Sequence, residues 1–411
     1  MKNLKNSPNY IFILVILALL IDNMLYGVIV PIVPFYATSL GITTTQIGWI
    51  FGIYSLALLL ASTPMGWAVD AYGYRPLLTA GMLGLALSTA AFIYSGSLPL
   101  LLLSRTLQGT SAAATWAAGL ALISEIFPSE VRGQKMGLAM TATGLGVIVG
   151  PVLGGFLYQA AGYTAPFVPF LVLGLLEGIL FYFSPLPGRS SSTSSGKIGF
   201  SILLKNRNLF WASMISVVGA FGFSMLEPTL PLQMGQRFGL SSAGVGAIFG
   251  AMSLAFSLSQ PFFGSLSDRR GRKPLIVIGL VAVAVLSPGL ALAPSLWVLF
   301  LVIGLLGIGT GAFATPNLPL LAESTEAAFS RTPDAAVDGG DDAAKASDSP
   351  LGTAFGIFNT VYSFGLMAGP LVGSAVTQRF GFLPLLLLFS LMLLVTAAGS
   401  ARWITETLRQ R

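Results

Sequence analysis

The stretch Gly66-Trp-Ala-Val-Asp-Ala-Tyr-Gly-Tyr-Arg-Pro76 decides the fold, because the chain carries its pattern twice. It returns 198 residues later as Gly264-Ser-Leu-Ser-Asp-Arg-Arg-Gly-Arg-Lys-Pro274, with glycine, aspartate, glycine, a basic residue and proline at the same spacing. Self-similarity at a fixed offset indicates a duplicated structural unit. We therefore predict two copies of one unit, each containing this motif between two apolar segments.

Two further pairs of motifs support the duplication. Pro31-x-x-Pro34 recurs as Pro228-x-x-Pro231, and Gly150-Pro151-x-x-Gly154 recurs as Gly369-Pro370-x-x-Gly373. The offset is 197 for the first pair and 219 for the second. An insertion at 324–350, which is rich in Asp and Ala, accounts for the larger offset. We expect that insertion to be disordered and cytoplasmic.

The composition is that of a membrane protein. Hydrophobic residues make up 54% of the chain and charged residues 9%, against about 25% charged residues in soluble domains. The apolar runs reach the roughly 20 residues that a bilayer requires, and they do not alternate as barrel strands do. The chain has no Cys and no His, so we expect no disulfide, no thiolate or histidine metal site, no metal and no cofactor.

We count twelve apolar spans and expect an all-α integral membrane protein with 12 transmembrane helices in two six-helix pseudo-symmetric halves. The Ser-rich tract at 188–196 divides them six and six. The predicted organisation is an N-terminal bundle at 1–187, a cytoplasmic linker at 188–206 and a C-terminal bundle at 207–411. The spans are predicted at 10–37, 46–69, 76–95, 98–125, 133–160, 164–186, 208–235, 242–267, 274–292, 295–323, 351–378 and 382–404.

Positive charge predicts the orientation. Nearly all Lys and Arg residues of the loops fall on the side of the N-terminus, and only Arg237 and Arg379 fall on the other side. The positive-inside rule then places both termini in the cytoplasm and explains the net charge of +6 without a nucleic-acid partner. The expected partners are the lipid bilayer, protons and a small molecule, and we expect a monomer.

Ionisable residues inside the spans are the strongest indication of function. Asp22, Glu177, Glu227 and Glu323 fall in spans one, six, seven and ten, and Arg105 falls in span four. Charges at this depth are costly and mark transport or proton pathways by default. Apolar surroundings favour the neutral form of a carboxyl group, which allows it to exchange protons. Glu177 lies in a span that we expect at the periphery, and we read it as a packing residue.

Aromatic residues accompany two of the carboxylates. Asp22 shares a helical face with Tyr26, and Glu227 shares one with Phe223. A carboxylate beside aromatic rings suits an organic ammonium, which gains an ion pair and a cation–π contact. Alternatively, both carboxylates bind backbone groups that the neighbouring prolines leave free. Trp116 and Tyr362 are further candidates for the wall of the site.

The repeated loop motif resembles the signature of the major facilitator superfamily, which implies its fold. The resemblance implies a conformational latch made by Gly66, Asp70, Gly73 and Arg75, and by Asp268 and Gly271 in the second copy. Gly66 and Gly73 would permit close approach and a tight turn.

Two further motifs resemble those of antiporters in this superfamily. Arg105 with Gln108 is similar to the Arg motif of proton-coupled drug antiporters, although it is also consistent with a structural Arg bonded to carbonyl groups. Gly150-Pro151 lies in a glycine-rich span that resembles the antiporter motif. The same glycines are consistent with simple helix packing, and both interpretations can hold.

Two strings are similar to those of the vesicular monoamine and acetylcholine transporters. They are Ile21-Asp-Asn-Met-Leu25 and Met225-Leu-Glu-Pro-Thr-Leu-Pro231. The resemblance implies that Asp22 engages a protonated amine beside Asn23 and that Glu227 contributes to recognition. It also implies that Glu323 couples transport to protons.

The chain departs from that family at two charged positions. Ser55 stands where the family has Lys, and Asn359 stands where it has Asp, so an ion pair is lost while the balance of charge is kept. The chain has no Asn-x-Ser/Thr acceptor and only a short loop at 38–45. We therefore expect a prokaryotic relative in the plasma membrane.

The expected function is a proton-coupled antiporter that exports cationic amines, monoamine-like or multidrug. The first alternative is a proton-coupled exporter of neutral or zwitterionic drugs or sugars, and the second is a non-transporting receptor or scaffold. We do not expect an enzyme, because the chain lacks His, Cys and a Gly-rich phosphate loop.

Overall fold

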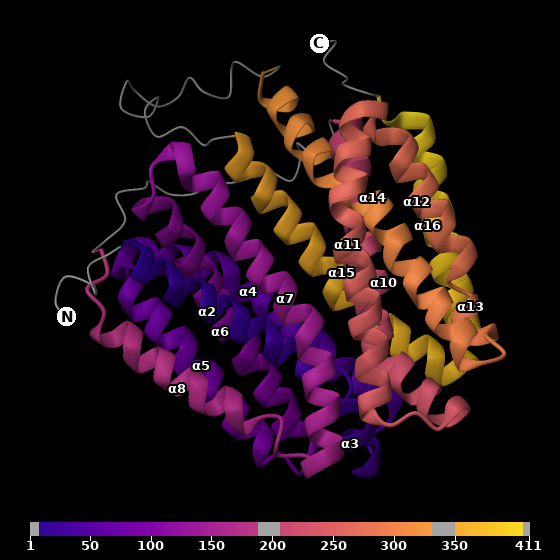
Figure 1. Ribbon diagram of the computed structural model, residues 1–411, viewed down its shortest axis with the longest axis horizontal. Coiled ribbons are helices and arrows are strands. Elements are labelled where there is room, and N and C mark those ends of the chain that lie inside the picture. The colour runs from indigo at the N-terminus through magenta and orange to yellow at the C-terminus, as the bar shows by residue number, and fades with distance from the viewer. Residues whose placement is uncertain (1–7, 188–205, 331–349, 406–411) are drawn as a thin grey trace. The chain divides into compact units, whose positions relative to one another are not determined.

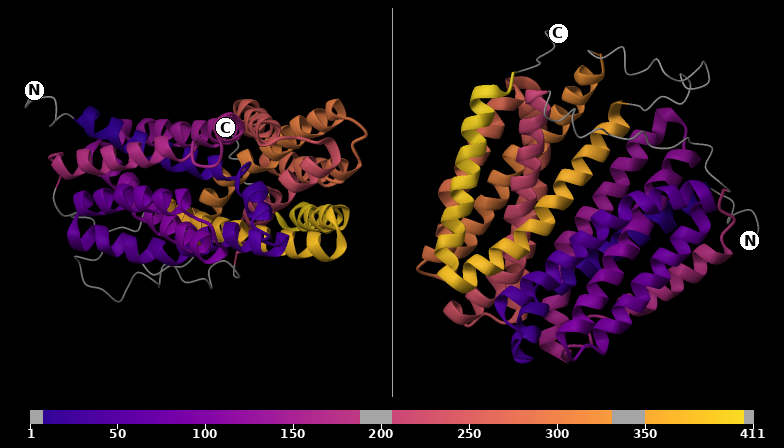
Figure 2. Two further views of the ribbon diagram at one scale, coloured as in Figure 1. Left: turned by 90° about the horizontal axis from the view of Figure 1, so that it is seen from below. Right: turned by 180° about the vertical axis from the view of Figure 1, so that it is seen from behind.

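The computed structural model describes residues 8–187, 206–330 and 350–405, and within these ranges the chain is built of helices (Figures 1 and 2). The first half contains α2 (Pro8–Ile29), α3 (Val33–Ser39), α4 (Thr44–Tyr72), α5 (Tyr74–Ile93), α6 (Leu98–Ile126), α7 (Ser129–Ala161) and α8 (Val168–Phe183). The second half contains α10 (Arg207–Phe238), α11 (Ser242–Arg270), α12 (Arg272–Leu286), α13 (Gly289–Leu292), α14 (Leu296–Ser330), α15 (Pro350–Phe380) and α16 (Phe382–Trp403). Apart from the short α3 and α13, these helices correspond one to one with the predicted spans.

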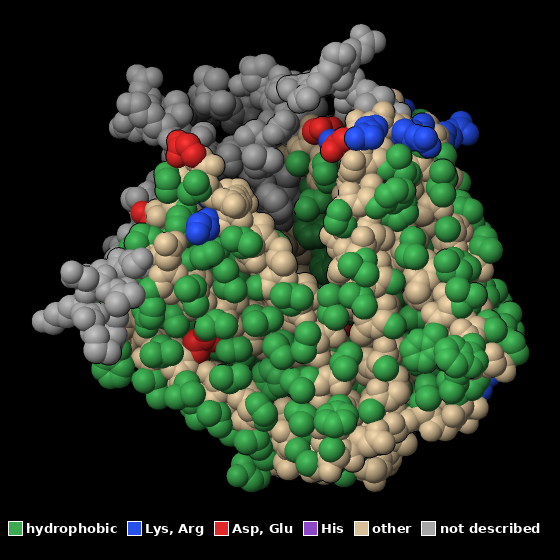
Figure 3. Space-filling model, viewed as in Figure 1, with side chains coloured by type: hydrophobic (Ala, Val, Ile, Leu, Met, Phe, Trp, Pro, Cys, Tyr) green, Lys and Arg blue, Asp and Glu red, His purple; other side chains and the backbone are tan. Residues whose placement is uncertain are grey.

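The helices are those of a multi-pass membrane protein. Among the described residues, nine helical segments are long and apolar enough to cross a membrane, and α8 is a shorter apolar helix. On the face shown in Figure 3, hydrophobic side chains are spread over both halves, and the few charged side chains lie mainly near one end of the helices. An outward-facing apolar surface of this kind is stable in lipid, where each helix satisfies its own backbone hydrogen bonds.

Proline explains where two predicted spans break. The first span is interrupted by a turn at 30–32 that contains Pro31, and the ninth is interrupted before Pro288. Proline supplies no N–H to the preceding turn and clashes with its carbonyl. By contrast, α10 continues through both Pro228 and Pro231. One boundary was wrong: α14 continues to Ser330, so the first residues of the predicted disordered insertion are helical.

The chain divides into two compact units. The first is Met1–Ser192 with Met225–Gly250 and Pro370–Ala375, and the second contains the remaining residues. In the first unit α2 packs on α7, α4 and α5 pack on α6, and α5 packs on α8; in the second, α12 packs on α14 and α16. The predicted linker at 188–206 lies outside the described residues except for Asn206.

Glycines bring α2 and α7 into backbone contact. A Cβ on Gly150 would lie 3.0 Å from the Cα of Gly27 and 2.5 Å from the carbonyl oxygen of Met24. A Cβ on Gly146 would lie 2.9 Å from the Cβ of Asn23. This is the small-residue packing expected of membrane helices. It fixes Asn23 against α7, so that Asp22 and Tyr26 project from other parts of α2.

The repeated motif forms the same turn in both halves. Gly73 has φ +85° and Gly271 has φ +91°, a region that favours glycine. The N–H of Gly73 donates to the carbonyl of Val69 at 2.8 Å, and that of Gly271 to the carbonyl of Ser267 at 3.0 Å. The tight turn is therefore confirmed, whereas the close approach expected at Gly66 was wrong, because a Cβ there would meet nothing within 4 Å.

Candidate substrate site

Residues of the first unit from α2, α6 and the later part of α10 bring ionisable side chains together inside the membrane-spanning region. Asp22 comes from α2, Arg105 from α6 and Glu227 from α10, and their exposed fractions are 2%, 0% and 0%. Arg105 interacts electrostatically with both carboxylates. We call Asp22, Arg105 and Glu227, with the aromatic residues around them, the central cluster. Sequence positions more than 200 residues apart thus form one buried group.

Each carboxylate of the central cluster accepts one hydrogen bond from an aromatic side chain. The hydroxyl of Tyr26 donates to Oε1 of Glu227 at 2.6 Å. The indole Nε1 of Trp116 donates to Oδ2 of Asp22 at 3.1 Å. Each bond holds its carboxylate in one orientation and places an aromatic ring beside it.

Arg105 is held by a carbonyl, an amide and aromatic faces. Its Nε donates to the carbonyl of Ile50 at 3.1 Å, and its Nη1 donates to Oε1 of Gln108 at 2.7 Å. Its Cζ lies 4.4 Å from the ring centroid of Tyr54 and 5.3 Å from that of Tyr26. Within the described residues it makes no ion pair within 4.0 Å of a carboxylate. The guanidinium therefore acts on both carboxylates through space, without blocking either one.

One polar atom of each charged group is buried and has no hydrogen-bond partner within the described part of the chain. These atoms are Oδ1 of Asp22, Oε2 of Glu227 and Nη2 of Arg105. Nε2 of Gln108 is also buried and has no hydrogen-bond partner among the described residues. Buried polar atoms without partners are rare and costly. The central cluster therefore carries two hydrogen-bond acceptors and two donors without partners among the described residues.

The prolines of α10 weaken the backbone ladder at Glu227. Pro228 and Pro231 lack the N–H groups that would bind the carbonyls of Ser224 and Glu227. Within the first unit, Glu227 is the residue that links α10 to α2 through the hydroxyl of Tyr26. A helix with missing internal bonds can bend at this point more readily than a regular one.

Five other predicted site residues have a hydrogen bond within their own helix or belong to the second unit. The amide of Asn23 donates to the carbonyl of Leu19, in its own helix, at 2.8 Å. Phe223, Asn359 and Tyr362 belong to the second unit. Glu323 also lies in the second unit, where it forms an ion pair with Arg272 and its side chain is 41% exposed. It is not a buried, unpaired carboxylate like Asp22.

The central cluster contains one residue that sequence reasoning missed, Tyr54, whose ring lies against the guanidinium of Arg105. Gln108 was named only as part of the motif of Arg105, and Trp116 was expected only as a wall residue. The three-residue spacing of Arg105 and Gln108 on one helix could have indicated their pairing. No sequence pattern singles out Tyr54. Glu177 is buried at 3% exposed, and neither of its oxygens has a partner in the described ranges.

A bundle of apolar helices around a buried charged cluster defines a membrane transporter. The sequence matches the Major Facilitator Superfamily over residues 15–232 and 212–411, so the chain belongs to this family. The assignment confirms the predicted fold and a transporter, not an enzyme.

Two related sequences and one solved structure are similar to the chain. It is 32% identical to the MFS-type transporter SLC18B1 of Mus musculus, over 87% of this chain and 78% of that protein. It is 26% identical to the synaptic vesicular amine transporter of Rattus norvegicus, over 72% of this chain and 54% of that protein. The fold resembles a bacterial homolog of the human lysosomal transporter Spinster, crystallised inward-facing and occupied, with a TM-score of 0.76 and 14% identity over 97% of this chain and 98% of that one.

Proposed function

We propose that the protein is a proton-coupled antiporter that exports cationic amines. The observation that carries this proposal is the charge of the central cluster. Asp22 and Glu227 contribute two negative charges when ionised and Arg105 contributes one positive charge, so a single negative charge remains in a buried site. A monovalent organic ammonium would neutralise it, and the unpartnered oxygens of the two carboxylates would accept its N–H groups.

The aromatic residues favour an organic cation over an inorganic one. Trp116 and Tyr26 are hydrogen-bonded to the carboxylates, and Tyr54 lies 5.0 Å from Tyr26 between ring centroids. Rings fixed beside a carboxylate offer both a cation–π contact and an apolar surface. Relatives named as amine transporters share 26% to 27% of the aligned residues with this chain, which supports the same ligand class here.

Proton coupling follows from competition for the same atoms. A proton on Asp22 removes the charge that attracts the ammonium, so loading with a proton releases the amine, and loss of the proton restores the site. Arg105 stays charged and acts as a positioning residue. Protonation of Glu323 would break its ion pair with Arg272 in the repeated motif, and we propose that this step couples protons to the latch. That latch comprises Asp70, Arg75, Asp268 and the two turn glycines.

The distribution of Lys and Arg supports a location in the cell membrane with both termini in the cytoplasm. A monomer is sufficient for the proposed cycle, because the residues of the central cluster come from one chain. Alternating access between the two sides of the membrane would deliver the amine outward and the proton inward.

The test is uptake of radiolabelled serotonin into proteoliposomes with an acidic interior. We expect uptake that a protonophore abolishes and that Asp22→Asn reduces to the level of empty liposomes. Glu177→Gln is the matched control, because it neutralises another buried carboxylate outside the central cluster. Absence of gradient-driven uptake of serotonin and of other organic cations by folded wild-type protein would contradict the proposal.

One observation favours a second candidate, export of zwitterions. Nη2 of Arg105 and Nε2 of Gln108 are buried donors without partners in the described part of the chain, and they would bind a carboxylate on the ligand. Competition distinguishes the two candidates. If excess zwitterionic amino acid does not reduce serotonin uptake, the substrate is the amine. If excess amine does not reduce uptake of the amino acid, the substrate is the zwitterion.

A further inference from the structure

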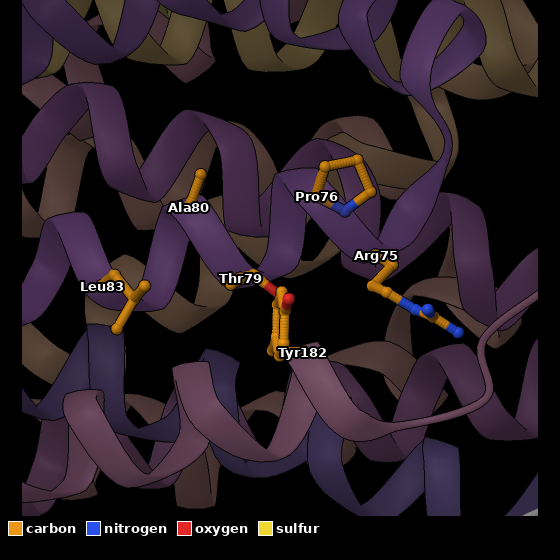
Figure 4. Close-up of a pocket in the computed structure, with 6 residues that line it drawn as sticks. All are labelled: Arg75, Pro76, Thr79, Ala80, Leu83 and Tyr182. Carbon is orange, nitrogen blue, oxygen red and sulfur yellow. The ribbon is translucent and has the colours of Figure 1, made fainter.

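A shallow groove runs between α5 and α8, away from the residues of the central cluster. Its volume is about 350 Å³, and it is lined by Arg75, Pro76, Thr79, Ala80, Leu83 and Tyr182 (Figure 4). Most of these side chains are apolar, and those of Leu83 and Tyr182 are exposed on the outer surface of their helices. In the membrane this groove would open toward the lipid.

Arg75 places a charge at one end of the groove. It follows the Gly73 turn and occupies the first turn of α5, where its guanidinium extends away from the apolar lining (Figure 4). Its side chain is exposed and makes no hydrogen bond or ion pair with the described residues. The first turn of a helix also carries free N–H groups, which add to the attraction for an anion.

Thr79 provides a buried hydroxyl one turn further along the groove. Several helical threonines donate to the carbonyl four residues earlier, as Thr89 and Thr106 do at 2.7 and 2.9 Å. Oγ1 of Thr79 is buried and has no partner among the described residues. Four residues correspond to about 6 Å along a helix, so the hydroxyl lies deeper in the membrane than the guanidinium.

We propose that this groove binds one anionic glycerophospholipid. Arg75 binds the phosphate, the hydroxyl of Thr79 donates to an ester carbonyl, and an acyl chain covers Pro76, Ala80 and Leu83. The order of groups matches that of a lipid in the leaflet next to the Gly73 turn: charge at the surface, a hydrogen-bond donor below it, and apolar surface below that. Basic pockets between membrane helices are suited to anionic headgroups.

Native mass spectrometry of the full-length protein in detergent tests the proposal, with equal amounts of dioleoyl phosphatidylglycerol or phosphatidylcholine added. Wild type should retain phosphatidylglycerol in preference to phosphatidylcholine. Arg75→Gln should lower the retained phosphatidylglycerol about fivefold, the effect of one basic residue near a charged headgroup. Ala80→Trp should displace the lipid while leaving the charge in place, and Thr79→Val should weaken retention of both lipids.

Arg132→Gln is the matched control, since it removes an exposed basic residue from α7, outside the groove. Thermal unfolding verifies that each variant is folded. Equal retention of both lipids by wild type would overturn the proposal, as would retention unchanged by Arg75→Gln and Ala80→Trp. Complete displacement of the lipid by inorganic phosphate would also overturn it, because the groove would then be a phosphate site only.

Discussion

The two halves of the chain share their turns but differ in their buried charge. The turns at Gly73 and at Gly271 each have a glycine with positive φ, whose N–H donates to the carbonyl four residues earlier. At the offset of 198 that relates these turns, Arg105 corresponds to Ile303 and Gln108 to Leu306. Ile303 and Leu306 are buried apolar residues. The duplication therefore preserved the turns that shape the fold, whereas the second copy has apolar residues at the positions that correspond to Arg105 and Gln108.

The ion pair of the second unit also differs from the buried carboxylates of the central cluster. Glu323 and Arg272 contact each other, and their side chains are 41% and 20% exposed. Asp22 and Glu227 are almost fully buried, and each keeps an oxygen without a partner in the described residues. A paired, half-exposed carboxylate suits a latch, whereas a buried carboxylate with a free oxygen suits a ligand.

The largest effect should follow from making the first half resemble the second. Arg105→Ile removes the positive charge of the central cluster. The carboxylates of Asp22 and Glu227 then repel each other without a compensating charge. Loss of one partner from a buried charged group costs about 3 to 5 kcal/mol, and the free energy of unfolding should fall accordingly. Denaturant unfolding in detergent measures it. Ile303→Leu is the control, and it should lower the free energy of unfolding by less than about 1.5 kcal/mol. Equal losses of unfolding free energy in the two variants would contradict the difference in buried charge between the two positions.

The next effect concerns ligand affinity. Asp22→Asn keeps the shape and the hydrogen bond from Trp116 but removes the charge, so the Kd for serotonin should rise about 30-fold, corresponding to about 2 kcal/mol for a buried charge pair. Glu323→Gln should leave the Kd unchanged, because its carboxylate is engaged with Arg272. Equilibrium binding of labelled serotonin in detergent gives both values. A rise in the Kd with Glu323→Gln and no rise with Asp22→Asn would contradict the prediction, because it would place the bound amine at Glu323 in the second unit.

A smaller effect should follow from separating α2 and α7. Gly150→Val places methyl groups where the backbones of Met24 and Gly27 lie, which should destabilise the protein by about 1 to 3 kcal/mol. Gly144→Val is a matched control on the same helix, since a Cβ at Gly144 meets nothing within 4 Å. Thermal unfolding of the two variants should differ by several degrees. Identical unfolding temperatures would show that the backbone contact does not hold α2 in place.

The smallest effect should come from the half-exposed ion pair. Arg272→Gln should lower the free energy of unfolding by less than about 1 kcal/mol. If the pair is part of the latch, the maximal rate of serotonin uptake will change while the Kd stays the same. Transport and binding measured on one preparation separate these quantities. A change in Kd alone would place Arg272 in ligand recognition.

The sequence predicted the helices better than their contacts. The repeated motif and the apolar runs located the helices to within a few residues, and Pro31 and Pro288 mark breaks that the hydropathy of the spans does not reveal. Asp22, Arg105 and Glu227 stood out because charge is rare in apolar helices. Tyr54 did not stand out, because its role depends on how α4 packs against α6, which no local pattern encodes.

The position of Glu323 could have been predicted more closely. Glu125, an exposed residue in the last turn of α6, lies at the same offset of 198 from Glu323, and this correspondence predicts that Glu323 is also partly exposed.

The most direct test of the central claim is proton release on ligand binding. Serotonin is added to the purified protein in weakly buffered detergent solution near neutral pH, and a pH indicator reports the protons released. If ammonium and proton compete for Asp22, wild type will release protons in proportion to the serotonin bound, and Asp22→Asn will release none at saturating ligand. Binding without proton release in wild type, or unchanged release in Asp22→Asn, would contradict the competition on which the account rests.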